Sequence, residues 1–149
     1  MIKKISILLL CFSILAIKPL GAEEKFLSLK KNKTNVRYGP GLDHPIKYIY
    51  RKINLPVKLI DKKENMRRVI FLDNNSGWIH RSQLKTSNSI IILEEKILFK
   101  KPSRFSTPIV RIEKGRLLIV RKCENSWCEI TTGDYSGWIK AENVWGSIK

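Results

Sequence analysis

The feature that most constrains this chain is an internal repeat. The segment Ser76-Gly77-Trp78-Ile79 recurs 60 residues later as Ser136-Gly137-Trp138-Ile139, and four identities in a row are not expected by chance in 149 residues. At the same offset the pair Glu64-Asn65 matches Glu124-Asn125. A repeat of this length predicts two small copies of one structural unit instead of a single larger domain.

Short strands fill each copy. Residues 46–50 alternate with a period of two, and the runs are rich in β-branched and aromatic side chains, which is typical of strands. Turn-forming segments such as Gly39-Pro40-Gly41 recur about every 10 residues, the rhythm of a small barrel or sandwich. Single helical turns are expected only just after each Gly-Trp, over residues 80–84 and 140–144.

The boundary between the copies is marked by Thr86-Ser87-Asn88-Ser89, a run of small polar residues between apolar strands. We therefore predict an all-β chain with one domain over residues 23–86 and a second over residues 87–149. A unit of about 60 residues buries only about 60% of its unfolded surface, so each copy needs its large side chains for packing. A core or corner position is accordingly the alternative role for each tryptophan.

The first 22 residues are of a different kind. Two lysines precede an apolar run from Ile5 to Ile17, and Gly21-Ala22 follows. This pattern predicts a signal peptide that is cleaved near Ala22, which would make the mature chain periplasmic or secreted. A bilayer crossing takes about 20 apolar residues, more than this run offers. A retained membrane anchor and a lipid attachment at Cys11 are the alternatives.

Cleavage would leave Cys123 and Cys128 as an even pair, and oxidising compartments favour disulfides. The four residues between them are the length of a tight turn between antiparallel strands, which sets the two Cα atoms opposite each other. We predict a disulfide that stabilises the fold by about 2 kcal/mol. Two free buried thiols are the alternative. A zinc site needs four ligands and the sequence has no further Cys or His pair, so neither metal nor cofactor is expected.

The residues that catalysis requires are sparse. There are two histidines, and bridged cysteines cannot provide a Cys/His nucleophile pair. Acidic residues occur singly apart from Glu23-Glu24 and Glu94-Glu95, neither of which has an obvious partner. Gly39-Pro40-Gly41 lacks the strand, helix and lysine that surround a phosphate-binding loop. We therefore predict that the protein is not an enzyme.

The charge of the chain indicates an anionic partner. Lys and Arg number 29 against 13 Asp and Glu, a net charge of +16, and removal of segment 1–22 with its three lysines leaves +13. The positive electrostatic field of such a chain attracts carboxylates. It also predicts weak, salt-sensitive contact with an anionic membrane or lipopolysaccharide. Part of the lysine excess fits a genome rich in A and T. Nucleic acid would also be attracted, but an exported protein rarely meets it, so none is expected.

A family resemblance adds to these observations. The run Asn35-Val36-Arg37-Tyr38-Gly39-Pro40-Gly41, followed by Pro45-Ile46, Pro56-Val57 and residues 77–84, resembles the signature of bacterial SH3-like (SH3b) domains. The tandem arrangement, with Cys-x4-Cys and a late Trp145-Gly146, is similar to small exported proteins of alphaproteobacteria. The resemblance spans about residues 26 to 148.

The resemblance implies two tandem SH3-like small β-barrels that bind and do not catalyse. Relatives are commonly attached to cell-wall enzymes, where they hold peptidoglycan, often by its peptide stems or cross-bridges. The second copy departs from the motif, because it has Phe99-Lys100-Lys101-Pro102-Ser103 in the corresponding place. That departure puts a ligand site in the second copy in doubt, so we assign this copy mainly a structural or spacing role.

The first copy carries a candidate ligand site that would lie along one groove of a small barrel. Its predicted members are Arg37, Tyr38, Asp43, Tyr48, Tyr50, Trp78 and His80. The aromatic rings would offer flat apolar surface to a peptide, and Arg37 would hold a carboxylate. Alternatively, Arg37 ties down its own loop, and Tyr48 or Tyr50 belongs to the core.

These observations predict a non-catalytic exported binding module. The ligand that they favour is a peptide of cell-wall peptidoglycan. The alternative is a protein-interaction adaptor that binds a periplasmic protein in an envelope complex.

Overall fold

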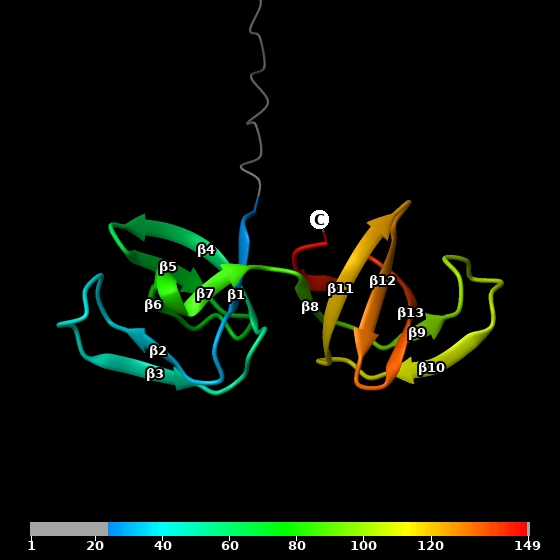
Figure 1. The fold of residues 1–149 in the computed structure, drawn as a ribbon, viewed down its shortest axis with the longest axis horizontal. Helices are drawn as coiled ribbons and strands as arrows, with labels where there is room; N and C mark the ends of the chain where they lie inside the picture. Colours follow the sequence, from blue (N-terminus) through cyan, green and yellow to red (C-terminus); the bar gives the residue numbers. More distant parts are fainter. Residues whose placement is uncertain (1–23, 149) are drawn as a thin grey trace, which may run out of the picture.

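The computed structural model describes residues 24–148. Two antiparallel sheets of seven strands, each curled into a small barrel, follow one another along the chain and lie side by side (Figure 1). The predicted signal peptide, residues 1–22 with cleavage near Ala22, lies outside the described residues. Within the described range, no helix has the length and apolar character needed to cross a bilayer.

The two sheets have the same topology. The elements of the first are β1 (Phe26–Leu29), β2 (Thr34–Arg37), β3 (Ile46–Tyr50), β4 (Pro56–Lys63), β5 (Met66–Ile70), β6 (Ser76–His80), the 3-10 turn η1 (Arg81–Gln83) and β7 (Leu84–Thr86). Those of the second are β8 (Ser89–Ile92), β9 (Lys96–Phe99), β10 (Pro108–Ile112), β11 (Leu117–Glu124), β12 (Trp127–Thr132), β13 (Tyr135–Lys140) and β14 (Val144–Gly146). The strand orders β3-β2-β6-β5-β4-β1-β7 and β10-β9-β13-β12-β11-β8-β14 place equivalent strands in equivalent positions, which confirms the predicted tandem all-β fold.

The strand pairing corrects one part of the sequence repeat. The β4–β5 hairpin turns at Glu64-Asn65, whereas the β11–β12 hairpin turns at Asn125-Ser126. The match of Glu64-Asn65 with Glu124-Asn125 is therefore wrong by one residue. The cause is the next hairpin: β5–β6 has 15 residues from Met66 to its partner His80, whereas β12–β13 has 14 from Trp127 to its partner Lys140.

One of the two expected helical turns is present. The turn predicted over residues 80–84 is η1, where the His80 ring accepts a hydrogen bond from the Ser82 backbone N–H at 3.3 Å. The turn predicted over residues 140–144 is absent from the second copy. Asn143 there has a φ of 52°, a left-handed conformation that a right-handed helical turn does not accommodate.

Each barrel encloses its own apolar core. The buried core residues of the first barrel are Leu29, Val36, Val57, Val69, Phe71, Ile79 and Leu84. Those of the second barrel are Ile90, Ile92, Leu98, Ile112, Leu118, Val120, Cys128, Ile130 and Ile139. Burial of such side chains stabilises the fold by roughly 1.5–3 kcal/mol each before the cost of chain ordering.

The repeated Gly-Trp step marks a close approach of two strands. A Cβ atom at Gly77 would lie 2.9 Å from the Arg37 carbonyl oxygen, and one at Gly137 would lie 2.6 Å from the Phe99 carbonyl oxygen. Because side chains alternate along a strand, Trp78 points away from the core that its buried neighbours enter. The glycine is thus needed for strand packing, and the tryptophan covers the outer face of the sheet.

The predicted disulfide is confirmed. Cys123 and Cys128 face each other across the β11–β12 hairpin with their Cα atoms 4.1 Å apart, and their sulfur atoms are bonded. The bridge closes the hairpin just beyond its turn.

The two barrels are joined by two residues and by a buried hydroxyl cluster. The Ser28 hydroxyl lies 2.8 Å from the hydroxyls of both Ser87 and Ser89. Ser89 Oγ in turn donates to the Asn54 carbonyl oxygen at 2.6 Å. All three serines are buried, so these hydrogen bonds satisfy hydroxyls that would otherwise be costly to remove from water.

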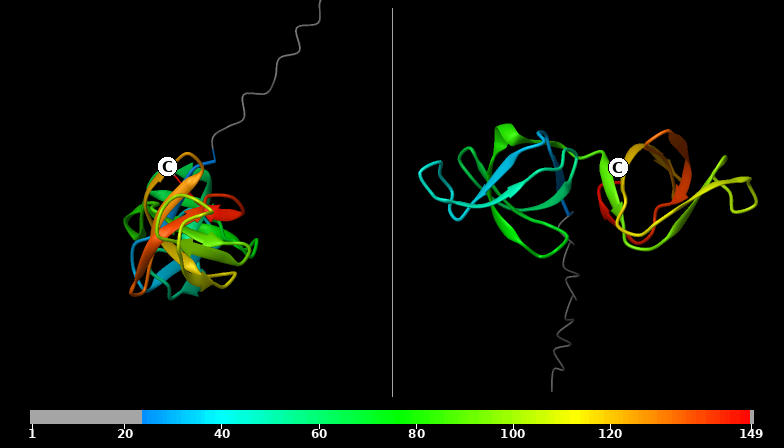
Figure 2. Two further views of the ribbon diagram at one scale, coloured as in Figure 1. Left: turned by 90° about the vertical axis from the view of Figure 1, so that its right-hand side faces the viewer. Right: turned by 90° about the horizontal axis from the view of Figure 1, so that it is seen from below.

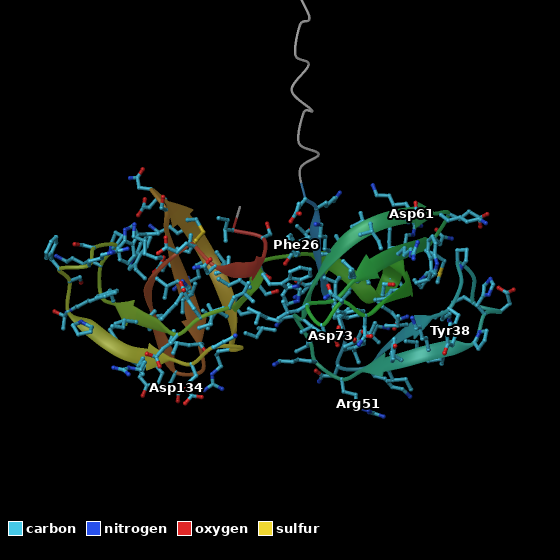
Figure 3. All side chains as sticks on the ribbon, turned by 180° about the vertical axis from the view of Figure 1, so that it is seen from behind. Phe26, Tyr38, Arg51, Asp61, Asp73 and Asp134 are labelled. Carbon is cyan, nitrogen blue, oxygen red and sulfur yellow. A yellow bond between two sulfur atoms is a disulfide. The ribbon has the colours of Figure 1, made fainter. Side chains whose placement is uncertain are left out.

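Trp145 connects the barrels a second time. Its indole Nε1–H donates to the Pro56 carbonyl oxygen at 3.1 Å, and its ring meets the edge of Phe26 at 5.2 Å between centroids. The labelled Phe26 lies at the junction, between the two barrels (Figure 3). Seen from below, the barrels form two adjacent rings connected by the chain segment that follows β7 (Figure 2).

Candidate functional site

Five of the seven predicted ligand residues lie on strands of the first barrel, where they occupy two different faces, and the other two, Tyr38 and Asp43, lie in the loop between β2 and β3. Arg37 on β2 pairs with Trp78 on β6, and both side chains point away from the core. Tyr48 on β3 instead pairs with Val36, which is fully buried, so Tyr48 and its neighbour Tyr50 face the core side. The residues therefore do not share one groove.

The guanidinium of Arg37 is already occupied. Its Nη1 donates to the His44 carbonyl oxygen at 2.6 Å, which ties down the loop between β2 and β3. In the same loop Tyr38 is 64% exposed, with the Lys47 ammonium 5.6 Å from its ring centroid, and Asp43 is exposed. The geometry thus favours the alternative in which Arg37 organises its own loop.

The outer face around Trp78 is basic. Trp78 lies between Arg37 and Arg68 on the neighbouring strands, and its side chain is half-buried. His80 lies at the end of the same strand, where its Nδ1 is 2.8 Å from the Ser82 hydroxyl. This contact together with the cap of η1 gives His80 a local structural role.

The tyrosines of β3 form the aromatic part of a different surface. Tyr50 stacks on Phe71 with 3.9 Å between ring centroids and an interplanar angle of 5°, and Tyr48 meets Tyr50 edge-on at 6.3 Å. The Tyr48 hydroxyl donates to Asn75 Oδ1 at 3.3 Å, and the Tyr50 hydroxyl donates to Asp73 Oδ2 at 3.5 Å. The rings thus present polar edges beside an apolar stack.

This surface continues into a groove of about 270 Å³ at the junction of the barrels. We call it the junction groove, and its lining residues are Tyr50, Leu55, Phe71, Leu72, Asp73 and Ile91. Five of the six come from the first barrel, while Ile91 comes from β8 of the second. The labelled Asp73 lies on the junction side of its barrel, whereas Asp61 and Tyr38 lie farther out (Figure 3).

The polar groups of the junction groove are a carboxylate and a phenol. Asp73 accepts hydrogen bonds from the Asn75 backbone N–H at 3.0 Å and from its side-chain amide at 2.8 Å, which fixes the carboxylate in place. Burial, and then the negative charge of Asp73, raise the pKa of Tyr50 above its ordinary value. The phenol therefore stays neutral and remains a hydrogen-bond donor at physiological pH.

Sequence reasoning found Tyr50 and missed the rest of the junction groove. The segment Asp73-Asn74-Asn75-Ser76-Gly77 has the composition of a turn, and turn residues often carry function. No local signal places Ile91 beside Tyr50, because they belong to different copies of the repeat. Among residues 24–148 there is no cluster of three or more His, Cys, Asp or Glu side chains that could hold a metal ion.

Two regions of the chain, residues 30–85 and 94–146, match the family model described as "Bacterial SH3 domain". Each match falls within one of the two barrels. No curated protein sequence matches the chain.

Several solved structures are similar in part. NlpC2 from Trichomonas vaginalis is 15% identical with a TM-score of 0.39, covering 83% of this chain and 48% of that one. NlpC1 from Trichomonas vaginalis is 14% identical with a TM-score of 0.39, covering 87% and 48%. An NlpC/P60 family protein from Bacillus cereus is 11% identical with a TM-score of 0.37, covering 80% and 55%. The chain thus spans about half the length of these proteins.

Proposed function

Because the chain belongs to the bacterial SH3 domain family, we propose that it is an exported, non-catalytic protein that binds a peptide of bacterial peptidoglycan. The observation that carries the proposal is the junction groove, in which the Tyr50–Phe71 stack lies beside the fixed carboxylate of Asp73. The resemblance of the sequence to wall-binding relatives indicates the class of ligand.

The chemistry of the junction groove suits a short peptide. A flat aromatic stack with the apolar walls Leu55 and Ile91 accommodates a peptide backbone with small side chains. The Asp73 carboxylate accepts hydrogen bonds from an ammonium or amide N–H, and a charged acceptor makes such bonds stronger. Peptidoglycan stems contain both groups, and their carboxylates are attracted by the net charge of +13 that remains after removal of segment 1–22.

Export is supported by the disulfide and by the predicted signal peptide. Structural disulfides persist in oxidising compartments and are rare in the cytosol. The bridge between Cys123 and Cys128 also leaves neither sulfur as a thiolate nucleophile. We therefore assign binding, and no chemistry, to the mature chain.

Co-sedimentation with purified sacculi tests the proposal. The chain beginning at Glu23 is suitable, because both sheets lie within residues 24–148. We expect Asp73→Asn to weaken pelleting about tenfold, as loss of one charged hydrogen bond predicts. Asp61→Asn is the matched control, since it removes the same charge from an exposed site on β4 and should leave pelleting unchanged.

Two results would count against wall binding. One is failure of the wild-type chain to pellet with sacculi at low salt. The other is equal pelleting of the Asp73→Asn variant, the Asp61→Asn variant and the wild type, all abolished by moderate salt, because charge attraction alone would then explain the binding.

The second candidate, an adaptor for a periplasmic protein, is favoured by the edge of the first sheet. β3 is the last strand of the sheet order, and it exposes Ile46 and Ile49. An exposed sheet edge accepts an added strand from a partner.

Ile49→Lys should block such pairing while leaving sacculus binding intact. Cross-linking of this variant in the native envelope therefore distinguishes the two functions.

A further inference from the structure

The loop between β9 and β10, residues 100–107, carries a fully exposed aromatic side chain. Phe105 has 101% of its reference surface accessible, so its ring is in contact with water on all sides. The loop projects at the end of the second barrel that is farthest from the junction (Figure 1). A single exposed apolar residue is common on protein surfaces. The residues around it indicate whether it belongs to an interaction site.

Those surroundings are strongly basic. Residues 96–112 contain no acidic residue and five basic ones, Lys96, Lys100, Lys101, Arg104 and Arg111. Three of the five face carboxylates outside the segment at 2.9 to 3.8 Å. Within the described part of the chain, the ammonium groups of Lys100 and Lys101 make no ion pair, so these two charges beside Phe105 are available to an outside partner.

The loop is held in shape by its own hydrogen bonds. The Lys101 backbone N–H donates to Ser106 Oγ at 2.9 Å, and the Phe105 backbone N–H donates to Ser103 Oγ at 3.2 Å. The Ser106 backbone N–H also donates to the Ser103 carbonyl oxygen at 3.1 Å. An ordered loop presents its side chains with little further loss of entropy on binding.

The equivalent loop of the first barrel, residues 38–45, has the apolar exposure without the charge. Its Tyr38 and Leu42 are 64% and 63% exposed. It contains no Lys or Arg, and it carries Asp43. The two loops are equal in length, so they form a natural pair for comparison.

We propose that loop 100–107 docks the second barrel on a bilayer surface rich in anionic phospholipid. The Phe105 ring enters the boundary between head groups and acyl chains, where apolar side chains of interfacial segments are buried. Lys100 and Lys101 lie over the lipid phosphates, which attract nearby basic residues. This contact is separate from the junction groove and does not rest on wall binding.

Vesicle sedimentation tests the proposal with the chain beginning at Glu23, since the apolar run of segment 1–22 would itself bind lipid. Vesicles of phosphatidylglycerol and phosphatidylcholine are compared with vesicles of phosphatidylcholine alone, and the wild-type chain should pellet only with the former. Phe105→Ser should reduce partitioning about tenfold because the ring no longer leaves water. Lys100→Gln with Lys101→Gln should reduce it about 25-fold, fivefold for each charge.

Leu42→Ser is the matched control and should partition as the wild type does. Circular dichroism of Phe105→Ser should match the wild type, because the ring contributes nothing to the core.

Three outcomes would overturn the proposal. If Phe105→Ser partitions like the wild type while the lysine variant does not, only the general charge of the chain is at work. If Leu42→Ser weakens binding as much as Phe105→Ser, apolar exposure alone accounts for the contact. Equal binding to neutral vesicles would also reject it.

Sacculus binding should be unaffected by Phe105→Ser, and vesicle binding should be unaffected by Asp73→Asn. Each proposal can therefore fail independently of the other.

Discussion

Tyr50 illustrates how the properties of one residue depend on neighbours that are remote in sequence. Its phenol is half-buried against Phe71 and faces the Asp73 carboxylate, and both surroundings disfavour the phenolate. The raised pKa therefore follows from the fold of the hairpin between β5 and β6. The same contacts define one wall of the junction groove.

We expect Asp73→Asn to lower the pKa of Tyr50, because the substitution removes a negative charge that opposes ionisation. Absorbance at 295 nm during a pH titration measures the change, and Tyr50→Phe identifies its signal among the tyrosines. A pKa raised in the folded state stabilises the fold below the unfolded pKa of about 10, and this contribution is lost as the pH rises through the folded pKa. A titration unchanged in Asp73→Asn would show that the carboxylate does not act on Tyr50.

The hairpin β11–β12 shows how local chemistry fixes an element. Its turn residues Asn125 and Ser126 have φ values of 47° and 65°, the left-handed conformations of a tight two-residue hairpin. The disulfide joins the strands one pair beyond the pairing of Glu124 with Trp127. The two-residue turn and the disulfide specify the same pairing register of β11 with β12. Each therefore stabilises the register that the other requires.

Replacement of Cys123 and Cys128 by Ala together should lower the free energy of unfolding by about 2 kcal/mol without changing the fold, because β12 remains paired with β13 and no hydroxyl is buried at the core position Cys128. Urea denaturation with and without dithiothreitol measures the loss. The reductant should destabilise the wild type to the level of the double variant and leave the variant itself unaffected. A wild type indifferent to reductant would contradict this account.

At the scale of the whole molecule, the two barrels contact each other through their junction. The link between β7 and β8 is short, the buried serine hydroxyls bridge it, and Trp145 reaches from the second barrel to Pro56 in the first. The second copy thereby supports the junction groove of the first through Ile91. The structural role of the second copy stays a prediction, and the position of Ile91 is compatible with it.

Trp145→Phe should destabilise the chain by about 1 kcal/mol, because the ring stays beside Phe26 but the hydrogen bond to the Pro56 carbonyl is lost. Trp145→Ala should cost about 2–3 kcal/mol, because the half-buried ring and its hydrogen bond are both lost, and should separate the unfolding of the barrels into two calorimetric transitions. Trp78→Phe, at a tryptophan remote from the junction contacts, is the control and should retain one transition. A single transition in Trp145→Ala would show that the barrels are coupled by other contacts.

The repeat, the strands, most turns and the disulfide could be predicted from local sequence patterns. Strand alternation and turn preferences act over a few residues, and the cysteines are separated by 5 positions, so local chemistry was sufficient. The face that each side chain occupies depends on the packing of the folded barrels. This packing directed Arg37 to the His44 carbonyl, and it brought Ile91 and Tyr50 into one groove.

The junction lay beyond the reach of sequence patterns for a physical reason. The hydrogen bond from Trp145 to Pro56 spans 89 positions in the chain, and no periodicity or propensity carries information over that distance. Such contacts depend on how two completed barrels pack, and packing is decided by the shapes of surfaces that exist only after each barrel has folded.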